Sequence, residues 1–254
     1  MLTNLALVLD KTAKVADARD TYQQALRLAQ DGQDKRQVAI IYGNMATTVA
    51  NQSLEKALEY YGRALSLHRE MGNRHLEGAL LSNIATTHLN GNQLDEAETH
   101  YKQALQIHRE NETKVWVGII LGGLGSLYRK RGNTDMALQH VLEAIEISRE
   151  TGHLFFEGMM HVELGVLHAA NNTAEASDTA FEQAEAILIQ ARDLRARAVF
   201  YHRRAQAEAD QNRWTEAQIS LDKARSMMHE LSLDNTSDLG QKLLNIETRI
   251  QNAS

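Results

Sequence analysis

Residues 74–110 read RHLEGALLSNIATTHLNGNQLDEAETHYKQALQIHRE, and this stretch contains the pattern from which we predict the fold. In its first half, apolar and small residues recur at mostly three- and four-residue steps, which predicts one face of an amphipathic helix. The Gly91-Asn92 pair then interrupts the pattern, as such pairs do between helices. The second half repeats the helical spacing from Leu94 to His108. We therefore expect two helices joined by a short turn, which makes them antiparallel.

The same arrangement recurs along the chain at a step of 39 or 40 residues. Three columns of small residues keep this step: Ala6, Ala46, Ala85, Gly125, Gly165 and Ala205; Ala18, Ala57, Ala97, Ala137, Ser177 and Ala217; and Ala25, Ala64, Ala104, Ala144, Ala184 and Ala224. Self-similarity at this period is typical of a solenoid, in which each unit buries its apolar face against its neighbours. We predict an all-α solenoid forming a single domain over residues 1–254. Its units should span about 1–34, 35–73, 74–113, 114–153, 154–193 and 194–233, with a capping helix over 236–252.

These residues resemble the tetratricopeptide repeat. The fourth unit has Leu121-x2-Leu124-Gly125-x2-Tyr128 followed by Ala137, which is the order of residues in that repeat. The period of 40 instead of 34 and the absence of the boundary proline resemble Pins-type scaffolds, kinesin light chains and bacterial signalling regulators. The resemblance implies a right-handed superhelix of about six helix-turn-helix units, whose first helices line a concave groove that binds peptide or protein segments.

Composition excludes several classes of function. The chain has no cysteine, and therefore no disulfide, thiolate metal site or thiol nucleophile. A net charge of −6 argues against general binding to nucleic acid or anionic membranes, and no segment has the roughly 18 apolar residues of a membrane span. No catalytic or phosphate-binding motif is present. We expect a soluble, cytoplasmic protein that is not an enzyme and needs no cofactor or metal.

The N-terminal register suggests a missing segment. Asn4-Leu5-Ala6 aligns with Asn44-Met45-Ala46, so Met1 falls inside the first helix of a unit. We expect the chain to be the C-terminal part of a longer protein. The alternative is a free-standing array that begins with an irregular half-unit, because terminal repeats are often atypical.

One polar column on the first helices is the main candidate for ligand binding. It reads Asn4, Asn44, Asn83, Gly123, Glu163 and Arg203. An asparagine amide has both donors and an acceptor and could hydrogen-bond the backbone of an extended peptide, a use that the resemblance also implies. The alternative is that these asparagines only hydrate the surface or bridge neighbouring helices. The full predicted set is Asn4, Asn44, Thr47, Asn83, Thr86, Ser126, Arg129 and Arg203.

Two further features qualify this groove. Ile40, Ala79, Ile119 and Gly123 stand where a carboxylate clamp of the family has basic residues, so we do not expect that mode of binding. Another column of the predicted groove has the apolar side chains of Ile119, Met159 and Val199. We therefore expect a ligand with one polar and one apolar half.

The sixth unit carries five arginines within thirteen residues: Arg192, Arg195, Arg197, Arg203 and Arg204. They form either a solvated face of a degenerate terminal unit or an anion-recognising end of the groove. Arg204 falls in a core column, and Glu208 four residues later predicts an ion pair within the helix.

Some residues that suggest a ligand site are better explained by packing. His161 and His168 lie seven residues apart on one helix, about 10 Å, which is too far for one metal ion. Trp116, Phe155 and Phe156 begin first helices, where we expect them to pack against the preceding helix.

The function predicted is non-catalytic recognition of a peptide or protein segment. The alternative is a C-terminal regulatory segment of a larger bacterial kinase, cyclase or ATPase. The oligomeric state and the identity of the partner are open.

Overall fold

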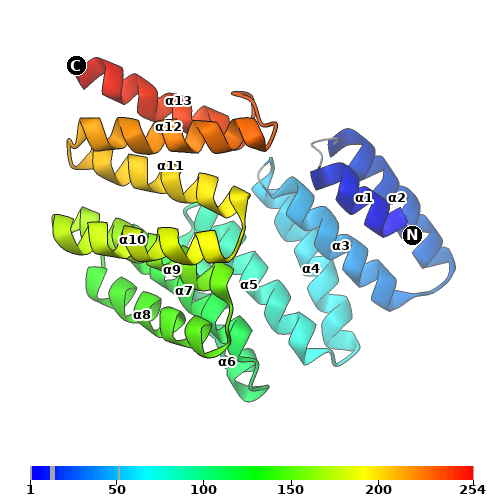
Figure 1. Cartoon of the computed structure of the whole chain (residues 1–254). Helices are drawn as coiled ribbons and strands as arrows, with labels where there is room; N and C mark the ends of the chain where they lie inside the picture. Colours follow the sequence, from blue (N-terminus) through cyan, green and yellow to red (C-terminus); the bar gives the residue numbers. More distant parts are fainter. Residues whose placement is uncertain (1, 12–14, 51, 254) are drawn as a thin grey trace. The chain divides into compact units, whose positions relative to one another are not determined.

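The computed structural model describes residues 2–11, 15–50 and 52–253, and these form thirteen α-helices without a strand (Figure 1). They divide into two compact units, residues 1–116 and 117–254, which we describe separately. The first unit contains α1 (Leu2–Lys11), α2 (Val15–Asp31), α3 (Lys35–Val49), α4 (Leu54–Glu70), α5 (Arg74–Asn90) and α6 (Leu94–Glu110). The unit boundary falls within α7 (Lys114–Lys130). The second unit continues with α8 (Thr134–Glu150), α9 (Leu154–Ala170), α10 (Ala174–Gln190), α11 (Leu194–Asp210), α12 (Trp214–Glu230) and α13 (Asp238–Ala253).

The 40-residue period has a simple structural origin. From α4 to α12 each helix is 17 residues long, and successive helices are joined by three residues. The middle residue of each of these turns has a positive φ, as at Gly72 (66°), Gly152 (67°) and Glu112 (53°). This left-handed residue ends the helix and reverses the chain, and glycine is the residue that adopts it with least strain. Two helices and two turns therefore make one repeat, as predicted.

The columns of small residues lie where the two helices of a hairpin approach most closely. Ala6, Ala46, Ala85 and Ala205 are fully buried. A Cβ atom added to Gly125 would lie 2.6 Å from Val141, and one added to Gly165 would lie 2.5 Å from Phe181. A real Cβ atom does not fit at such distances, so the column is small because the partner helix occupies the space.

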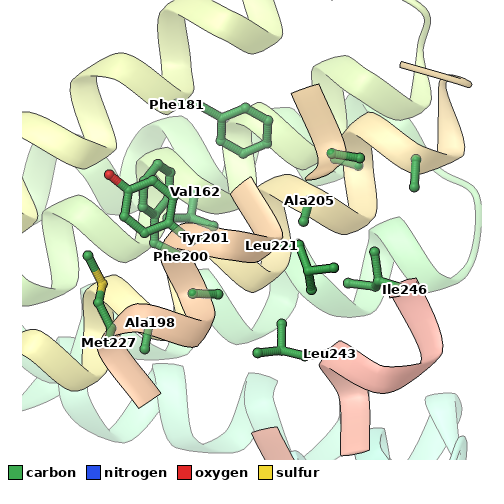
Figure 2. Packing of buried hydrophobic residues seen from close by; sticks show 14 of the residues in the cluster. Val162, Phe181, Ala198, Phe200, Tyr201, Ala205, Leu221, Met227, Leu243 and Ile246 are labelled. Carbon is green, nitrogen blue, oxygen red and sulfur yellow. The ribbon is translucent and has the colours of Figure 1, made fainter. Parts of the chain in front are cut away.

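The core of the second unit continues into the last helix. Figure 2 shows Phe200 and Tyr201 of α11 close to Phe181 of α10, and Leu243 and Ile246 of α13 directed toward Leu221. Leu243 and Ile246 are at most 1% exposed, and Ile250 is also buried. The helix α13 therefore caps the array as expected, with bounds one or two residues from those predicted. No helix in the described part of the chain is long and apolar enough to cross a membrane.

Candidate functional site

The asparagine column of the first unit lies at the surface of its helices. Asn44 of α3 is half-buried, and Asn83 of α5 and Asn4 of α1 are exposed. Their position follows from helical spacing: Met45 and Ile84, one residue further on, are core residues. The backbone carbonyls of Asn44 and Asn83 accept hydrogen bonds from Thr48 and Thr87, but their side chains have no partner among the described residues. Both amides are therefore available to a ligand.

The threonines beside these asparagines have a second role that the sequence did not reveal. The Thr47 hydroxyl lies 3.0 Å from the Tyr61 hydroxyl, and Thr86 lies 2.9 Å from Tyr101. Each threonine donates its proton to a backbone carbonyl one turn earlier, so each tyrosine is the donor to threonine. Burial raises the pKa of both tyrosines. Thr47 and Thr86 are exposed, yet their hydroxyls also link the first helix of each repeat to the second.

In the second unit the polar column contains a buried acid. Glu163 of α9 is 4% exposed, and its two carboxylate oxygens accept from Arg129 Nε of α7 at 2.5 Å and from Arg203 of α11 at 2.6 Å. Burial alone would raise the pKa of Glu163, but the two guanidiniums outweigh it and lower the pKa below its ordinary value. Glu163 thereby fixes two arginines of the predicted site, one from each neighbouring first helix (we call these three residues the arginine bridge).

The sequence placed Arg129 and Arg203 in the site but assigned no role to Glu163. A signal was present: Glu163 and Arg203 occupy the same column one period apart and carry opposite charges. Because consecutive first helices are neighbours in a solenoid, such a pair predicts an ion pair between repeats. Ser126 is half-buried on α7, one turn before Arg129.

An apolar pocket of about 270 Å³ lies between α9 and α11. It is lined by Phe155 and Met159 of α9, by Asp193 at the N-cap of α11, and by Arg195, Ala196 and Val199 of α11. Phe155 is 42% exposed, so a large part of its ring is not covered by packing against the preceding helix. The neighbouring Phe156 points elsewhere, because its ring lies 2.9 Å from where a Cβ of Gly122 would stand. Successive helical residues face different sides, and only Phe155 falls on the open one.

Trp116 was also predicted to pack against the preceding helix, and it packs against α6. Its ring stacks on that of His108 of α6, with centroids 5.2 Å apart and an interplanar angle of 8°. His108 is fully buried and donates to or accepts from Thr113 at 2.7 Å. Trp116 therefore belongs to the packing of the first unit.

The arginines of α11 lie in different environments. Arg204 donates to Glu208 at 2.8 Å, as predicted, and its guanidinium lies 5.7 Å from the centroid of Phe181. Glu208 is 1% exposed and also accepts from Ser220 at 2.7 Å. Arg204 is therefore half-buried against the core, whereas Arg203 belongs to the arginine bridge and the exposed Arg195 lines the apolar pocket.

The histidines are mainly explained by packing. His161 is 5% exposed, as expected of a core position, and His168 is half-exposed with Nδ1 3.2 Å from Thr173. In the part of the chain that the structure describes, no three His, Asp or Glu side chains come together as a metal site would require.

Comparison with known proteins agrees with this architecture. The chain matches sequence profiles described as tetratricopeptide repeat over residues 2–36, 37–110 and 76–150. No curated protein matches it significantly.

Among solved structures, the chain is similar to BtubC from P. vanneervenii, with 22% identity over 75% of this chain and 80% of that one and a TM-score of 0.65. It is also similar to a Rap protein complexed with Competence and Sporulation Factor, with 13% identity, 100% and 76% coverage and a TM-score of 0.71. Aspartyl phosphate phosphatase F from Bacillus subtilis gives 13% identity, 98% and 68% coverage and a TM-score of 0.73. At these identities the likeness concerns the fold.

Tetratricopeptide repeats form protein-interaction modules, and their fold is generally non-catalytic. With profile matches over more than half of its length and hairpins of the required pattern, the chain belongs to the tetratricopeptide repeat family.

Proposed function

We propose that this protein binds an extended segment of a partner protein along the first helices of its first unit, α1, α3 and α5. The observation that carries the proposal is the pair of unpartnered amides of Asn44 and Asn83 at equivalent positions of α3 and α5. A primary amide offers two donors and one acceptor, which matches the N–H and C=O groups of a peptide backbone. Asn4 occupies the same column on α1 and extends the same chemistry by one repeat.

Such backbone contacts give affinity with little dependence on the ligand's sequence. Specificity then comes from side-chain sites, as in other modes of peptide recognition. The arginine bridge and the apolar pocket of the second unit provide two such sites of different chemistry. We take the partner to be protein and not nucleic acid, because the chain has a net charge of −6.

The test is a selection from random peptides displayed internally on a carrier protein, carried out on the whole chain. We expect enrichment on the wild-type chain and at least a tenfold loss of affinity, on the order of 1.4 kcal/mol, in Asn44→Ala/Asn83→Ala. Asn90→Ala is the matched control, because Asn90 is an exposed asparagine at the end of α5, outside the column. If the double variant binds the enriched peptides as tightly as the wild type, the asparagine column is not the binding face.

A second candidate function is regulation of a catalytic domain in a larger bacterial signalling enzyme. It is favoured by similarity to a Signal Transduction ATPase with Numerous Domains from Pyrococcus horikoshii that has a tetratricopeptide repeat sensor, where the match covers 98% of this chain but 36% of that one. The size of the native protein separates the two: a cytoplasmic species near 28.5 kDa supports the free-standing adaptor. A much larger species with a catalytic domain supports the regulatory segment.

A further inference from the structure

We infer that the second unit recognises an acidic side chain of the bound segment between Arg129 and Arg203, with a neighbouring apolar side chain of that segment in the pocket beside Phe155. This inference rests on the proposed function and specifies what kind of segment is bound. It is carried by the arginine bridge, the apolar pocket and their positions on the same helices.

The arginine bridge leaves donors free for a ligand. Glu163 receives one N–H from Arg129, at Nε, and one from Arg203, at a terminal nitrogen. No other hydrogen bond or ion pair uses these two guanidiniums among the described residues, and their side chains are 30% and 29% exposed. Each guanidinium has five N–H donors in a planar fork, so most of them remain available.

The buried acid orients the arginines without cancelling both charges. Glu163 holds one negative charge between two positive ones and is itself shielded from solvent. Arg195 adds a third guanidinium at the pocket, while Asp193 accepts from the backbone N–H of Ala196 as a helix cap. The arginine bridge and the pocket lining together contain three guanidiniums and two carboxylates, so their summed charge is positive on a chain whose net charge is −6. The complementary ligand group is a carboxylate, which two guanidiniums can bind with charge-assisted hydrogen bonds.

The apolar pocket lies on the same faces of the same helices. Met159 and Val199 precede Glu163 and Arg203 by four residues, which is one helical turn or about 6 Å. Phe155 precedes Glu163 by eight residues, about 12 Å. An extended chain rises about 3.3 Å per residue, so an acidic side chain and an apolar one two or three positions away can occupy both sites.

Apolar surface flanks the arginine bridge on its other side as well. Val166 follows Glu163 by three residues and is half-buried on α9. Side chains next to the acidic residue can therefore contact apolar surface on either side of the arginine bridge. This favours an internal Asp or Glu over the free carboxylate of a chain terminus.

The experiment uses the internally displayed peptides selected above, which have no free terminus. We expect the enriched sequences to share an Asp or Glu two or three positions from a large apolar residue. Replacing that acid by its amide in the peptide should lower affinity for the wild-type chain about tenfold. The affinity of the acidic peptide should also fall as salt is raised from 50 to 500 mM, because added salt screens the attraction.

Protein variants assign the effect to the arginine bridge. Arg129→Gln and Arg203→Gln should each lower affinity about tenfold, and Arg203→Lys should lose less because it keeps the charge. The control is Arg225→Gln, because Arg225 also links two helices, through Glu247 at 2.8 Å, but lies outside the face. Circular dichroism melts establish that each variant is folded, and the peptide substitution tests the inference even if one of them is not.

The outcomes separate this inference from the proposed function. Enriched peptides that need Asn44 and Asn83 but lack an acid, or that tolerate its replacement, would overturn the inference and leave the proposed function standing. No enrichment on a folded chain would overturn both.

Discussion

Arg203 of α11 donates to Glu163 of α9 at 2.6 Å, and the acid that it reaches is 4% exposed. This ion pair joins the first helices of two consecutive repeats. Arg129, from the first helix of a third repeat, makes a second ion pair with Glu163. A buried carboxylate is tolerated only when its charge is paired, so packing of these helices depends on both arginines being present.

Replacing Glu163 by Gln should therefore destabilise the chain. The variant leaves two guanidiniums facing each other without the charge between them, and we expect the free energy of unfolding to fall by about 2–3 kcal/mol. Urea denaturation followed by circular dichroism measures it. The control is Glu59→Gln, which removes the exposed pair with Arg63 and should change stability by less than about 0.5 kcal/mol. Equal effects of the two substitutions would contradict the structural role of Glu163.

Stability should also fall on mild acidification. Burial lowers the pKa of His108 and of His202 to about 4, aided by His75 and by Arg203 respectively. Burial also lowers the pKa of His68 and His161. In the unfolded chain these rings titrate near 6.5, so between about pH 6.5 and 4 the unfolded state binds more protons than the folded state.

The stabilisation from neutral histidines is therefore complete above about pH 6.5 and is lost as the pH falls toward 4. Urea midpoints measured at half-unit steps from pH 7.5 to 4.5 should decrease below pH 6.5. The variant His108→Gln should show a shallower decrease than the wild type. A midpoint that rises between pH 7 and 5 would show that other groups dominate.

The turn residues offer a route to higher stability. Arg192 has a φ of 55°, in a position where other turns of the chain have Gly72 or Gly152. Arg192→Gly should raise the free energy of unfolding by about 1 kcal/mol, because glycine adopts this conformation without strain from a Cβ. Glu182→Gly, at an exposed site inside α10, should instead lower it by about 1 kcal/mol. Chemical denaturation of both variants checks the opposite signs.

Replacing glycine by alanine should have opposite effects on stability at Gly165, which is in a column of small residues, and at Gly62, which is not. A Cβ at Gly165 would lie 2.5 Å from the ring of Phe181, whereas nothing lies within 4 Å of one at Gly62. Gly165→Ala should destabilise by about 1–3 kcal/mol through overpacking. Gly62→Ala should stabilise by up to about 1 kcal/mol through helix propensity. Stabilisation of the chain by Gly165→Ala in thermal and urea unfolding would show that the contact with Phe181 leaves room for a methyl group.

The fold follows from the repeat pattern of the sequence. A small residue is required wherever the two helices of a hairpin touch, and this contact recurs in every repeat. The resulting 40-residue pattern can therefore be recognised from the sequence. The same local logic located the Asn44 and Asn83 column, the Arg204–Glu208 pair and the capping helix, because positions along one helix share a face at fixed spacing.

The contacts of the candidate-site side chains could be found only from the packing of the helices. Thr47 has a partner in Tyr61, Phe155 opens onto a pocket, and Glu163 binds two arginines from two other helices. Each of these facts depends on which neighbouring helix lies opposite and how far away it is. Helical periodicity determines the face of the helix on which a residue lies but not which residue of another helix contacts it. A contact between residues 34 or 40 positions apart depends on how whole repeats pack against each other.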